Sequence, residues 1–302
     1  MARQWNVMIV AGPTASGKSA LALRLADACG GEIVNADALQ IYSDLAILTA
    51  RPSDAEMARV PHHLFGIAPG EEAWSAGRWL RAARETLDQI RDRNRPAVVV
   101  GGSGLYLRAL TEGLADIPAI PLAVRSEVRA LFDSLGEAAF RERLAQADPA
   151  AAGRIAAGDR QRLTRAMEVH RATGRPLSHW RGAAHEGLAP GSWRALVIDP
   201  PRDRLYAACD ARLARMISQG ALEEVARLAA RGLPGHLPIM KAVGLRPLLA
   251  HLAGTCDLGA ALASAQQETR RYAKRQLTWL RGQCPDWPRL DDPEDFLPHI
   301  SP

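Results

Sequence analysis

Short apolar runs alternate along much of the chain with longer segments whose apolar residues recur at helical spacing. Helical periodicity marks residues 20–31, which close on Gly30 and Gly31, and residues 75–93. The apolar runs predict buried strands at residues 5–11, 32–36, 97–100 and 195–198. Together these segments predict an α/β fold, with a parallel sheet flanked by helices.

The stretch from residue 116 to residue 190 has a different character. Pro118 and Pro121 mark a linker, and the residues after them read as short helices rich in Arg and Ala, without a strand. We therefore expect a smaller all-helical insertion domain at 116–190. The core domain would then consist of residues 1–115 and 191–302.

The rest of the pattern is helical or irregular. Helices are predicted at 204–219 and 221–231, and a long basic helix follows near the end of the chain. Residues 41–67, interrupted by Pro52 and Pro61, and the tail after Pro285 are expected to be irregular.

A complete G-x-x-x-x-G-K-[ST] phosphate loop stands between the first predicted strand and helix, which is the context that this motif requires. Gly12 and Gly17 allow a tight turn that points successive N–H groups and a helix N-terminus at one anion. Lys18 would add charge on the phosphates, and the Ser19 hydroxyl would ligate Mg²⁺. The alternative is an ordinary glycine-rich turn. The predicted binding site for a di- or triphosphate is Gly12, Pro13, Thr14, Ala15, Ser16, Gly17, Lys18 and Ser19.

Three polar residues follow predicted strands and should reach the edge of the sheet that carries the phosphate loop. Asp37 fits catalysis or metal binding, or else a plain helix N-cap. Ser103, in a glycine-rich turn, could donate to a phosphate oxygen, or the turn could serve its backbone alone. Asp199 could pass for a Walker-B carboxylate, although the two prolines behind it favour a strand exit.

Two basic segments suggest contact with nucleic acid. Residues 159–165 contain three arginines, which could equally form a solvated helix face. On the last long helix five cations fall within an arc of roughly 140°, with Tyr272 and Trp279 at its edge. Such a face suits a phosphodiester backbone, and the alternative is again a solvated surface. The five cations are Arg270, Arg271, Lys274, Arg275 and Arg281.

Composition narrows the class of protein only slightly. Among 302 residues, Lys and Arg exceed Asp and Glu by 38 to 33, which permits nucleic acid as a partner without requiring it. No apolar run approaches the roughly 18 residues of a membrane helix, so no membrane association is expected. The four cysteines form no C-x-x-C pair, and there is no signal-peptide layout, so we expect a cytoplasmic protein with reduced thiols. The adjacent His62 and His63 are expected to be structural rather than metal-binding.

The chain resembles the tRNA dimethylallyltransferase (tRNA isopentenyltransferase) family from about Val10 to Gly282. The phosphate loop alone is shared by many enzymes, whereas the motifs after it, and their order, are more specific. The resemblance rests on AGPTASGKS, DALQIY at 37–42, VPHHL, GGSGLYLRAL at 101–110, DRQRLTRAMEV at 159–169, LPIMKAVGLR at 237–246 and RRYAKRQLTWLRG at 270–282.

The resemblance implies transfer of a dimethylallyl group from its diphosphate to the exocyclic amine of the adenosine 3′ of the anticodon in tRNA. The P-loop, typical of nucleotide- and ATP-binding proteins, would here hold the allyl diphosphate, with Mg²⁺ as counter-charge. Asp37 matches the general base, and Ser103 and Arg125 match positions that contact the substrate. The implied tRNA-binding residues are Asp37, Ala38, Leu39, Gln40, Gln161, Arg162, Leu163, Thr164, Arg165, Lys241, Arg246, Arg271, Lys274 and Arg275. We expect a monomer.

Four positions depart from the family pattern. Ala38 follows the catalytic acid where the family usually has Ser, and Ala46 and Leu48 replace an acid and a glycine. Gly66 stands where an acid commonly ends the PHHL block. These changes affect expected loop geometry and leave the diphosphate motif intact.

Two other functions compete with prenyl transfer. A P-loop small-molecule kinase would need an ATP site and an arginine lid, which the helical insertion could supply. A non-catalytic RNA-binding protein with a vestigial loop is the second alternative. The presence of Lys18, Ser19 and Asp37 together argues against it.

Overall fold

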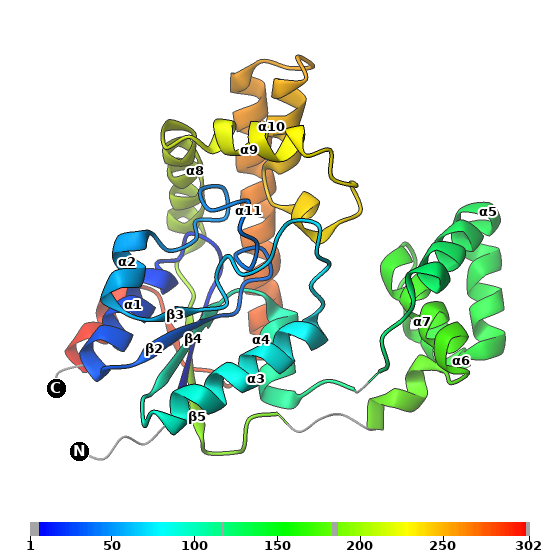
Figure 1. Cartoon of the computed structure of the whole chain (residues 1–302), viewed down its shortest axis with the longest axis horizontal. Helices are drawn as coiled ribbons and strands as arrows, with labels where there is room; N and C mark the ends of the chain where they lie inside the picture. Colours follow the sequence, from blue (N-terminus) through cyan, green and yellow to red (C-terminus); the bar gives the residue numbers. More distant parts are fainter. Residues whose placement is uncertain (1–5, 116, 183–186, 300–302) are drawn as a thin grey trace. The chain divides into compact units, whose positions relative to one another are not determined.

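The computed structural model describes residues 6–115, 117–182 and 187–299, and it divides the chain into two compact units (Figure 1). One unit joins the chain up to Thr111 with the part from Leu188 onward, and the other is Glu112–Gly187. The helical unit was expected at 116–190, so the division falls a few residues earlier at each end.

The first unit is built on one parallel sheet of six strands in the order β3-β2-β4-β1-β5-β6. The four longer strands lie where the apolar runs predicted them, which confirms the α/β fold. The strands are β1 (Val7–Ala11), β2 (Glu32–Asn35), β3 (His62–His63), β4 (Ala97–Gly101), β5 (Trp193–Ile198) and β6 (Arg289–Leu290).

Two edge strands and a short helix correct the prediction of irregular structure. β3 and the helix α2 (Asp54–Arg59) lie within 41–67, and β6 and the 3-10 helix η3 (Pro293–His299) lie after Pro285. Two-residue strands are too short to show a hydrophobic period, so only pairing with a longer neighbour defines them. The histidine pair is therefore an edge strand of the sheet, in parallel register with Ile33 and Val34.

Helices cover both faces of the sheet because alternate strand residues point to opposite sides. Met8, Val10 and Val98 pack with the apolar side of α1 (Lys18–Cys29). Trp79 of α3 (Ala76–Asp92) is fully buried and donates its indole N–H to the Asn35 carbonyl at the end of β2. The other helices of this unit are α4 (Gly104–Glu112), α8 (Arg202–Ser218), α9 (Ala221–Ala230), η2 (Pro238–Lys241), α10 (Leu245–Leu252) and α11 (Leu258–Gln283).

The regular secondary structure in the described residues of the second unit is helical. α5 (Leu122–Ala147) is broken at Gly136, whose φ is 71°, and it packs with α7 (Arg160–Thr173) through residues such as Phe132, Phe140 and Leu163. The shorter elements α6 (Pro149–Arg154) and η1 (Leu177–Gly182) complete the unit. Across the described ranges of the whole chain, no helix has the length and apolar character needed to span a membrane.

A buried carboxylate ties the start of β2 to its neighbours. Glu32 is 2% exposed and accepts two hydrogen bonds from Arg93, at 3.0 and 2.7 Å, and one from Arg95 at 3.2 Å. His63 Nε2 lies 2.6 Å from the same carboxylate. Burial by itself raises the pKa of Glu32, but the bonds from Arg93 and His63 outweigh burial and leave this pKa below its ordinary value.

Replacing this carboxylate should destabilise the fold. Glu32→Gln is expected to lower the free energy of unfolding by about 2 kcal/mol at pH 7, because the charge that satisfies Arg93 and Arg95 is lost. Since the folded-state pKa is depressed, this stabilisation exists above pH ~4.3 and disappears as the pH falls through the lowered value. Urea unfolding at pH 7 and pH 3 measures it. Asp27→Asn, which breaks an exposed pair with Arg59, is the control and should cost less than about 0.5 kcal/mol. Equal effects of the two variants would contradict the role of Glu32.

Candidate active site

The phosphate loop connects β1 to α1 with a backbone that only small residues allow. Gly17 has a φ of 84° and lies at the N-cap of α1, and Ala15 has a φ of 62°. A Cβ on Gly12 would lie 2.8 Å from Ser16 Oγ and 3.0 Å from the Ile198 carbonyl oxygen, so a larger residue does not fit there. The loop thus presents backbone N–H groups and a helix N-terminus, as its motif predicts.

Two cations, the buried Lys18 and the half-buried Arg212, lie at this loop. Lys18 Nζ donates to the Pro13 carbonyl at 3.0 Å, and Arg212 of α8 lies with Nη1 3.4 Å from Thr14 Oγ1. Burial lowers the pKa of Lys18 to about 8, against the charge of Asp37, and the neighbouring Arg212 lowers it further. Burial also lowers the pKa of Arg212. Two desolvated cations that repel each other across one carboxylate form a place where a polyvalent anion is strongly stabilised.

Asp37 follows β2 directly and is held by its own turn. Its N–H donates to Asn35 Oδ1 at 2.7 Å, and its Oδ1 accepts the Leu39 N–H at 2.9 Å. No helix begins at this point of the described chain, so the helix N-cap interpretation is wrong. One carboxylate oxygen fixes the turn, which leaves the other oriented by the same geometry for a substrate or metal.

Ser103 is fixed by contacts to the same turn. Its Oγ accepts the Ala38 N–H at 3.0 Å, and its N–H donates to the Ala36 carbonyl at 3.3 Å. The Tyr272 hydroxyl of α11 hydrogen-bonds with Ser103, and burial, followed by the charge of Asp37, raises the pKa of Tyr272. Ser103 is thus part of a tight turn and also carries a hydroxyl beside the carboxylate, and its donation to a phosphate oxygen stays a prediction.

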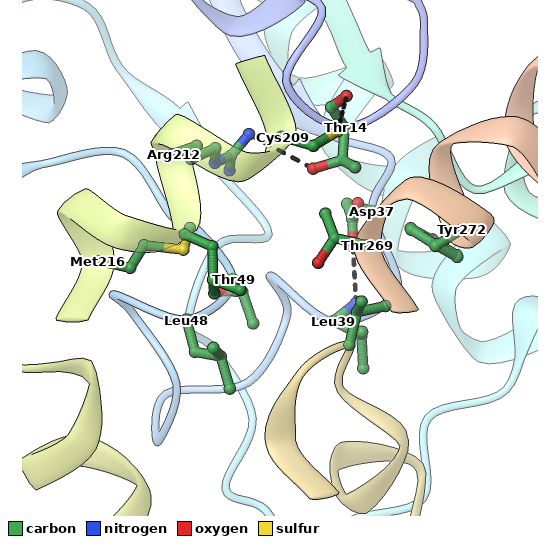
Figure 2. A pocket seen from close by; sticks show the side chains of 12 residues that line it. Thr14, Asp37, Leu39, Leu48, Thr49, Cys209, Arg212, Met216, Thr269 and Tyr272 are labelled. Atoms are coloured by element: carbon green, nitrogen blue, oxygen red, sulfur yellow. Dashed lines mark hydrogen bonds between the residues drawn. The ribbon is translucent and has the colours of Figure 1, made fainter. Parts of the chain in front are cut away.

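A pocket opens beside Asp37 and combines a polar part with an apolar wall (Figure 2). Figure 2 shows Arg212 and Met216 entering from α8, and Thr269 and Tyr272 from α11, with Asp37 among them. The polar lining is Thr14, Asp37, Thr49, Arg212, Thr269 and Tyr272, and the other lining residues are Leu39, Leu48, Cys209, Leu213, Met216 and Val243. Such a pocket suits a ligand with one charged end and one apolar end.

Several of these residues were not identified from the sequence. The pattern of α8 is that of an ordinary amphipathic helix, so it did not single out Arg212, Leu213 or Met216. Tyr272 was predicted only to lie at the edge of the basic face. The pattern that would have found Arg212 is a cation on the buried side of a helix. Cys209 is inert here, because burial raises the pKa of its thiol to about 11.

A second buried carboxylate shapes one wall of the pocket. Glu224 of α9 is buried and accepts the N–H groups of Ala46 and Ile47 at 2.6 and 2.9 Å and that of Leu48 at 2.9 Å. Leu48, the residue found in place of a glycine, points its side chain into the pocket and has no positive φ, so its backbone needs no glycine. The carboxylate, rather than an acid at position 46, holds this loop.

Removing the charge of Glu224 should therefore disturb substrate binding. Glu224→Gln is expected to raise the KM for the allyl diphosphate expected in this pocket about 5- to 10-fold, with a smaller change in kcat. An amide accepts fewer of the three N–H groups, so the loop that carries Leu48 is held less firmly. Steady-state kinetics measure this. Glu223→Gln, one residue earlier and exposed, is the matched control. Unchanged kinetics in Glu224→Gln would show that this carboxylate does not shape the pocket.

The glycine at position 66 also has a structural reason. Gly66 has a φ of 60°, and a Cβ there would collide with the guanidinium of Arg51. Arg51 Nη1 donates to the Tyr42 carbonyl at 3.1 Å. The departure from the family pattern at this position therefore makes room for an arginine that braces the segment after Asp37.

Two of the five cations predicted on the basic face of α11 form ion pairs within the protein. Arg270 binds the Asp210 carboxylate at 2.6 and 2.7 Å, and Arg281 binds Asp199 at 3.1 and 2.8 Å. Asp199 also pairs with Arg289, so it anchors the C-terminal segment and is not a Walker-B carboxylate. Trp279, expected at the edge of the basic face, is packed against Gly104.

The remaining cations of this region are on the surface. Arg271, Lys274 and Arg275 of α11 are exposed, as are Lys241 and Arg246, and Arg246 lies 3.4 Å from Glu268. Arg275 lies over the Tyr272 ring, 5.6 Å from its centroid. These side chains, rather than all five cations of the arc, are available to a polyanion.

In the helical unit, the predicted tRNA-binding residues differ in exposure. Gln161 and Arg162 are exposed, Arg162 by 76%, whereas Leu163 is fully buried in the core of the unit. Thr164 is buried and donates its hydroxyl to the Arg160 carbonyl at 2.9 Å. In a helix, neighbouring side chains point in different directions, some to the surface and some to the core, and the side chains of Leu163 and Thr164 are not at the surface. Burial lowers the pKa of Arg165, against the opposing charge of Glu168, and nearby Arg125 lowers it further.

Two protein-family models match the chain. The family described as "IPP transferase" matches residues 40–283, and the one described as "Isopentenyl transferase" matches residues 5–64. A protein of Phenylobacterium zucineum named tRNA dimethylallyltransferase is 60% identical over 291 residues, covering 96% of this chain and 94% of its own.

Two solved structures resemble the fold. The tRNA isopentenylpyrophosphate transferase of Bacillus halodurans is 30% identical with a TM-score of 0.67, covering 99% of this chain and 93% of its own. A eukaryotic dimethylallyltransferase described as acting on tRNA is 25% identical with a TM-score of 0.80, covering 91% of this chain and 70% of its own.

Proposed function

The chain belongs to the IPP transferase family of tRNA dimethylallyltransferases, and we propose that it transfers a dimethylallyl group from dimethylallyl diphosphate to a tRNA adenosine. The acceptor is the exocyclic amine of the adenosine 3′ of the anticodon, and the products are N6-isopentenyladenosine and diphosphate. The observation that carries this proposal is the pocket beside the phosphate loop, whose lining combines Arg212, the Asp37 carboxylate and an apolar wall.

The phosphate loop acts on the leaving group. When the allylic C–O bond breaks, its electron pair stays on the diphosphate, and negative charge grows there. Lys18 and Arg212 are already desolvated, so together with N–H groups of the loop they stabilise that charge with little reorganisation. The apolar wall formed by residues such as Leu48 and Met216 accommodates the five-carbon group and excludes water from its cationic carbon.

Asp37 acts on the nucleophile. An adenine amine is weakly nucleophilic, and it must lose a proton as the new C–N bond forms. A carboxylate held by the Leu39 N–H is positioned to accept this proton. Ser103, beside Asp37, contacts the substrate, and we assign Arg125 of the helical unit to the same role. The target base leaves its stack to reach such a pocket.

The residues of the phosphate loop fit a magnesium ion whose main ligands are phosphate oxygens. The Ser19 hydroxyl is exposed at the start of α1, and the described residues contain no cluster of three carboxylate, His or Cys side chains. Mg²⁺ bound to phosphates keeps several waters and takes few protein ligands, so this donor set suits it. Ser19 would hold the ion, which supplies counter-charge to the diphosphate.

A set of mostly basic and polar residues contacts the tRNA. We assign this role to Gln161, Arg162 and Arg165 in the helical unit, to the turn from Asp37 to Gln40, and to Lys241, Arg246, Arg271, Lys274 and Arg275. The enzyme acts as a monomer in the cytoplasm, where its tRNA substrate is found. Of the expected set, the buried Leu163 and Thr164 contribute packing rather than a side-chain contact.

Salt dependence tests the basic face of α11. The double variant Lys274→Gln with Arg275→Gln should reduce the slope of log K against log salt by about 1.5 to 2, because two phosphate contacts are lost. Filter binding of tRNA at several salt concentrations measures the slope. The matched double variant Arg84→Gln with Arg91→Gln removes the same charge from α3. Equal slopes for the two double variants would exclude the α11 residues from the tRNA interface.

A binding comparison separates prenyl transfer from the kinase alternative. Calorimetric titration with dimethylallyl diphosphate and with ATP, each with Mg²⁺, should give at least a tenfold tighter Kd for the allyl diphosphate, because the apolar wall has no polar partner for a ribose or a purine. A preference for ATP of that size would contradict the proposal and support the kinase.

A further inference from the structure

One buried amide on α11 bridges the two turns of the site. Gln276 is 6% exposed, and its Oε1 accepts the Thr14 N–H of the phosphate loop at 2.9 Å. Its Nε2 donates to the Gly102 carbonyl at 3.0 Å, in the turn that leads into Ser103. These bonds span 262 and 174 residues of sequence, so a single side chain connects segments that are far apart along the chain.

The packing around this amide is tight. A Cβ on Gly102 would collide with Gln276 Nε2 and lie 2.6 Å from the Gly12 carbonyl oxygen. Gly102 has no positive φ, so a glycine is needed there for close approach rather than for backbone conformation. The phosphate loop, the glycine turn and the amide therefore form one closely fitted unit.

The same face of α11 lines the pocket. Thr269 and Tyr272 precede Gln276 by seven and four residues, which places the three side chains along one side of the helix. Thr269 and Tyr272 line the pocket, and Gln276 holds the loop behind it. The amide thus fixes the spacing between the phosphate loop and the groups around Asp37.

We propose that Gln276 is a positioning residue for the transfer reaction: it holds the phosphate loop and the Ser103 turn in the one relative geometry that aligns the leaving diphosphate with Asp37. This rests on the proposed function. Only a side chain with both an acceptor and a donor makes the two bonds, and a neutral one adds no negative charge beside the diphosphate. A misplacement of about 1 Å between such groups can cost about 100-fold in rate.

Two substitutions test this role. Gln276→Met keeps the volume and removes both bonds, leaving the Thr14 N–H and the Gly102 carbonyl unsatisfied. It should lower kcat/KM for dimethylallyl diphosphate about 10- to 100-fold, with the Kd for tRNA within about twofold of wild type. Gln266→Met, on the same helix and bonded to the Asp210 carbonyl at 3.4 Å, is the control and should change neither constant.

Gln276→Glu tests the positioning role through the pH dependence of kcat/KM, which a purely structural role would not change. An ionised carboxylate loses the donor to Gly102 and places negative charge near the diphosphate, whereas a protonated carboxyl restores both bonds. The ratio of variant to wild-type kcat/KM should therefore rise at least tenfold between pH 8 and pH 5.5. The loss of activity of wild type at low pH cancels in this ratio.

The outcomes separate the two claims. A wild-type enzyme without transfer activity would contradict the proposed function itself. An active wild type, with Gln276→Met equal to Gln266→Met and a flat ratio for Gln276→Glu, would overturn the positioning role alone. If Gln276→Met fails to fold, the pH dependence of the folded Gln276→Glu variant decides the question by itself.

Discussion

Asp37→Asn is expected to lower kcat for prenyl transfer by about 10²- to 10⁴-fold and to leave the Kd for tRNA within about twofold. The asparagine carbonyl can still accept the Leu39 N–H, so the turn is kept. What is lost is the ability to take a proton from the adenine amine, which matters only in the transition state. Single-turnover kinetics with saturating tRNA, together with tRNA binding, measure the two quantities.

The control for this variant is Asp92→Asn, which removes an exposed carboxylate at the end of α3. It should leave both constants unchanged. If Asp37→Asn weakened tRNA binding by the same factor as it lowered kcat, Asp37 would act through binding alone, and its assignment as the base would be wrong.

The second large effect concerns the charge of Lys18. Burial lowers the pKa of this side chain to about 8, so the free enzyme loses the cation as the pH rises through that value. Because kcat/KM reports the free enzyme, kcat/KM for dimethylallyl diphosphate should fall about tenfold per pH unit above pH 8. Bound diphosphate stabilises the cation, so the corresponding fall in kcat should lie at higher pH.

Lys18→Met should lower kcat/KM at pH 7 by about 10³-fold, since it removes a desolvated charge from the leaving group, and it should abolish this limb of the pH profile. The profile is measured from pH 7 to pH 9.5 at constant ionic strength and fixed free Mg²⁺. A wild-type kcat/KM that stayed level over this range would contradict a titrating Lys18 in the diphosphate site.

The elements that could be predicted from the sequence are those whose pattern lies within a few consecutive residues. β1, β4 and β5 each contain a continuous apolar run, β2 has Ile33 and Val34 at its centre, and the phosphate loop carries its glycines and lysine within eight residues. β3 and β6 contain two residues each, so they have no period of their own and depend on pairing with neighbouring strands.

The parts of the site that were missed depend on distant partners. Arg212 and Gln276 lie on helices that read as ordinary, and their roles arise only when they meet Thr14, which lies 198 and 262 residues away. Arg270 and Arg281 looked like part of a nucleic-acid surface, yet they pair with carboxylates 60 and 82 residues away. Charge on a helix face can be counted from sequence, whereas its partner depends on the packing of the folded chain.

We propose that the phosphate loop and Asp37 together carry out prenyl transfer to tRNA. The most direct test is mass analysis of nucleosides from tRNA incubated with the protein, dimethylallyl diphosphate and Mg²⁺. We expect an adenosine heavier by one C5H8 unit, with release of diphosphate and with the modification lying 3′ of the anticodon. Unmodified adenosine at that position, with wild-type protein that binds both substrates, would contradict it.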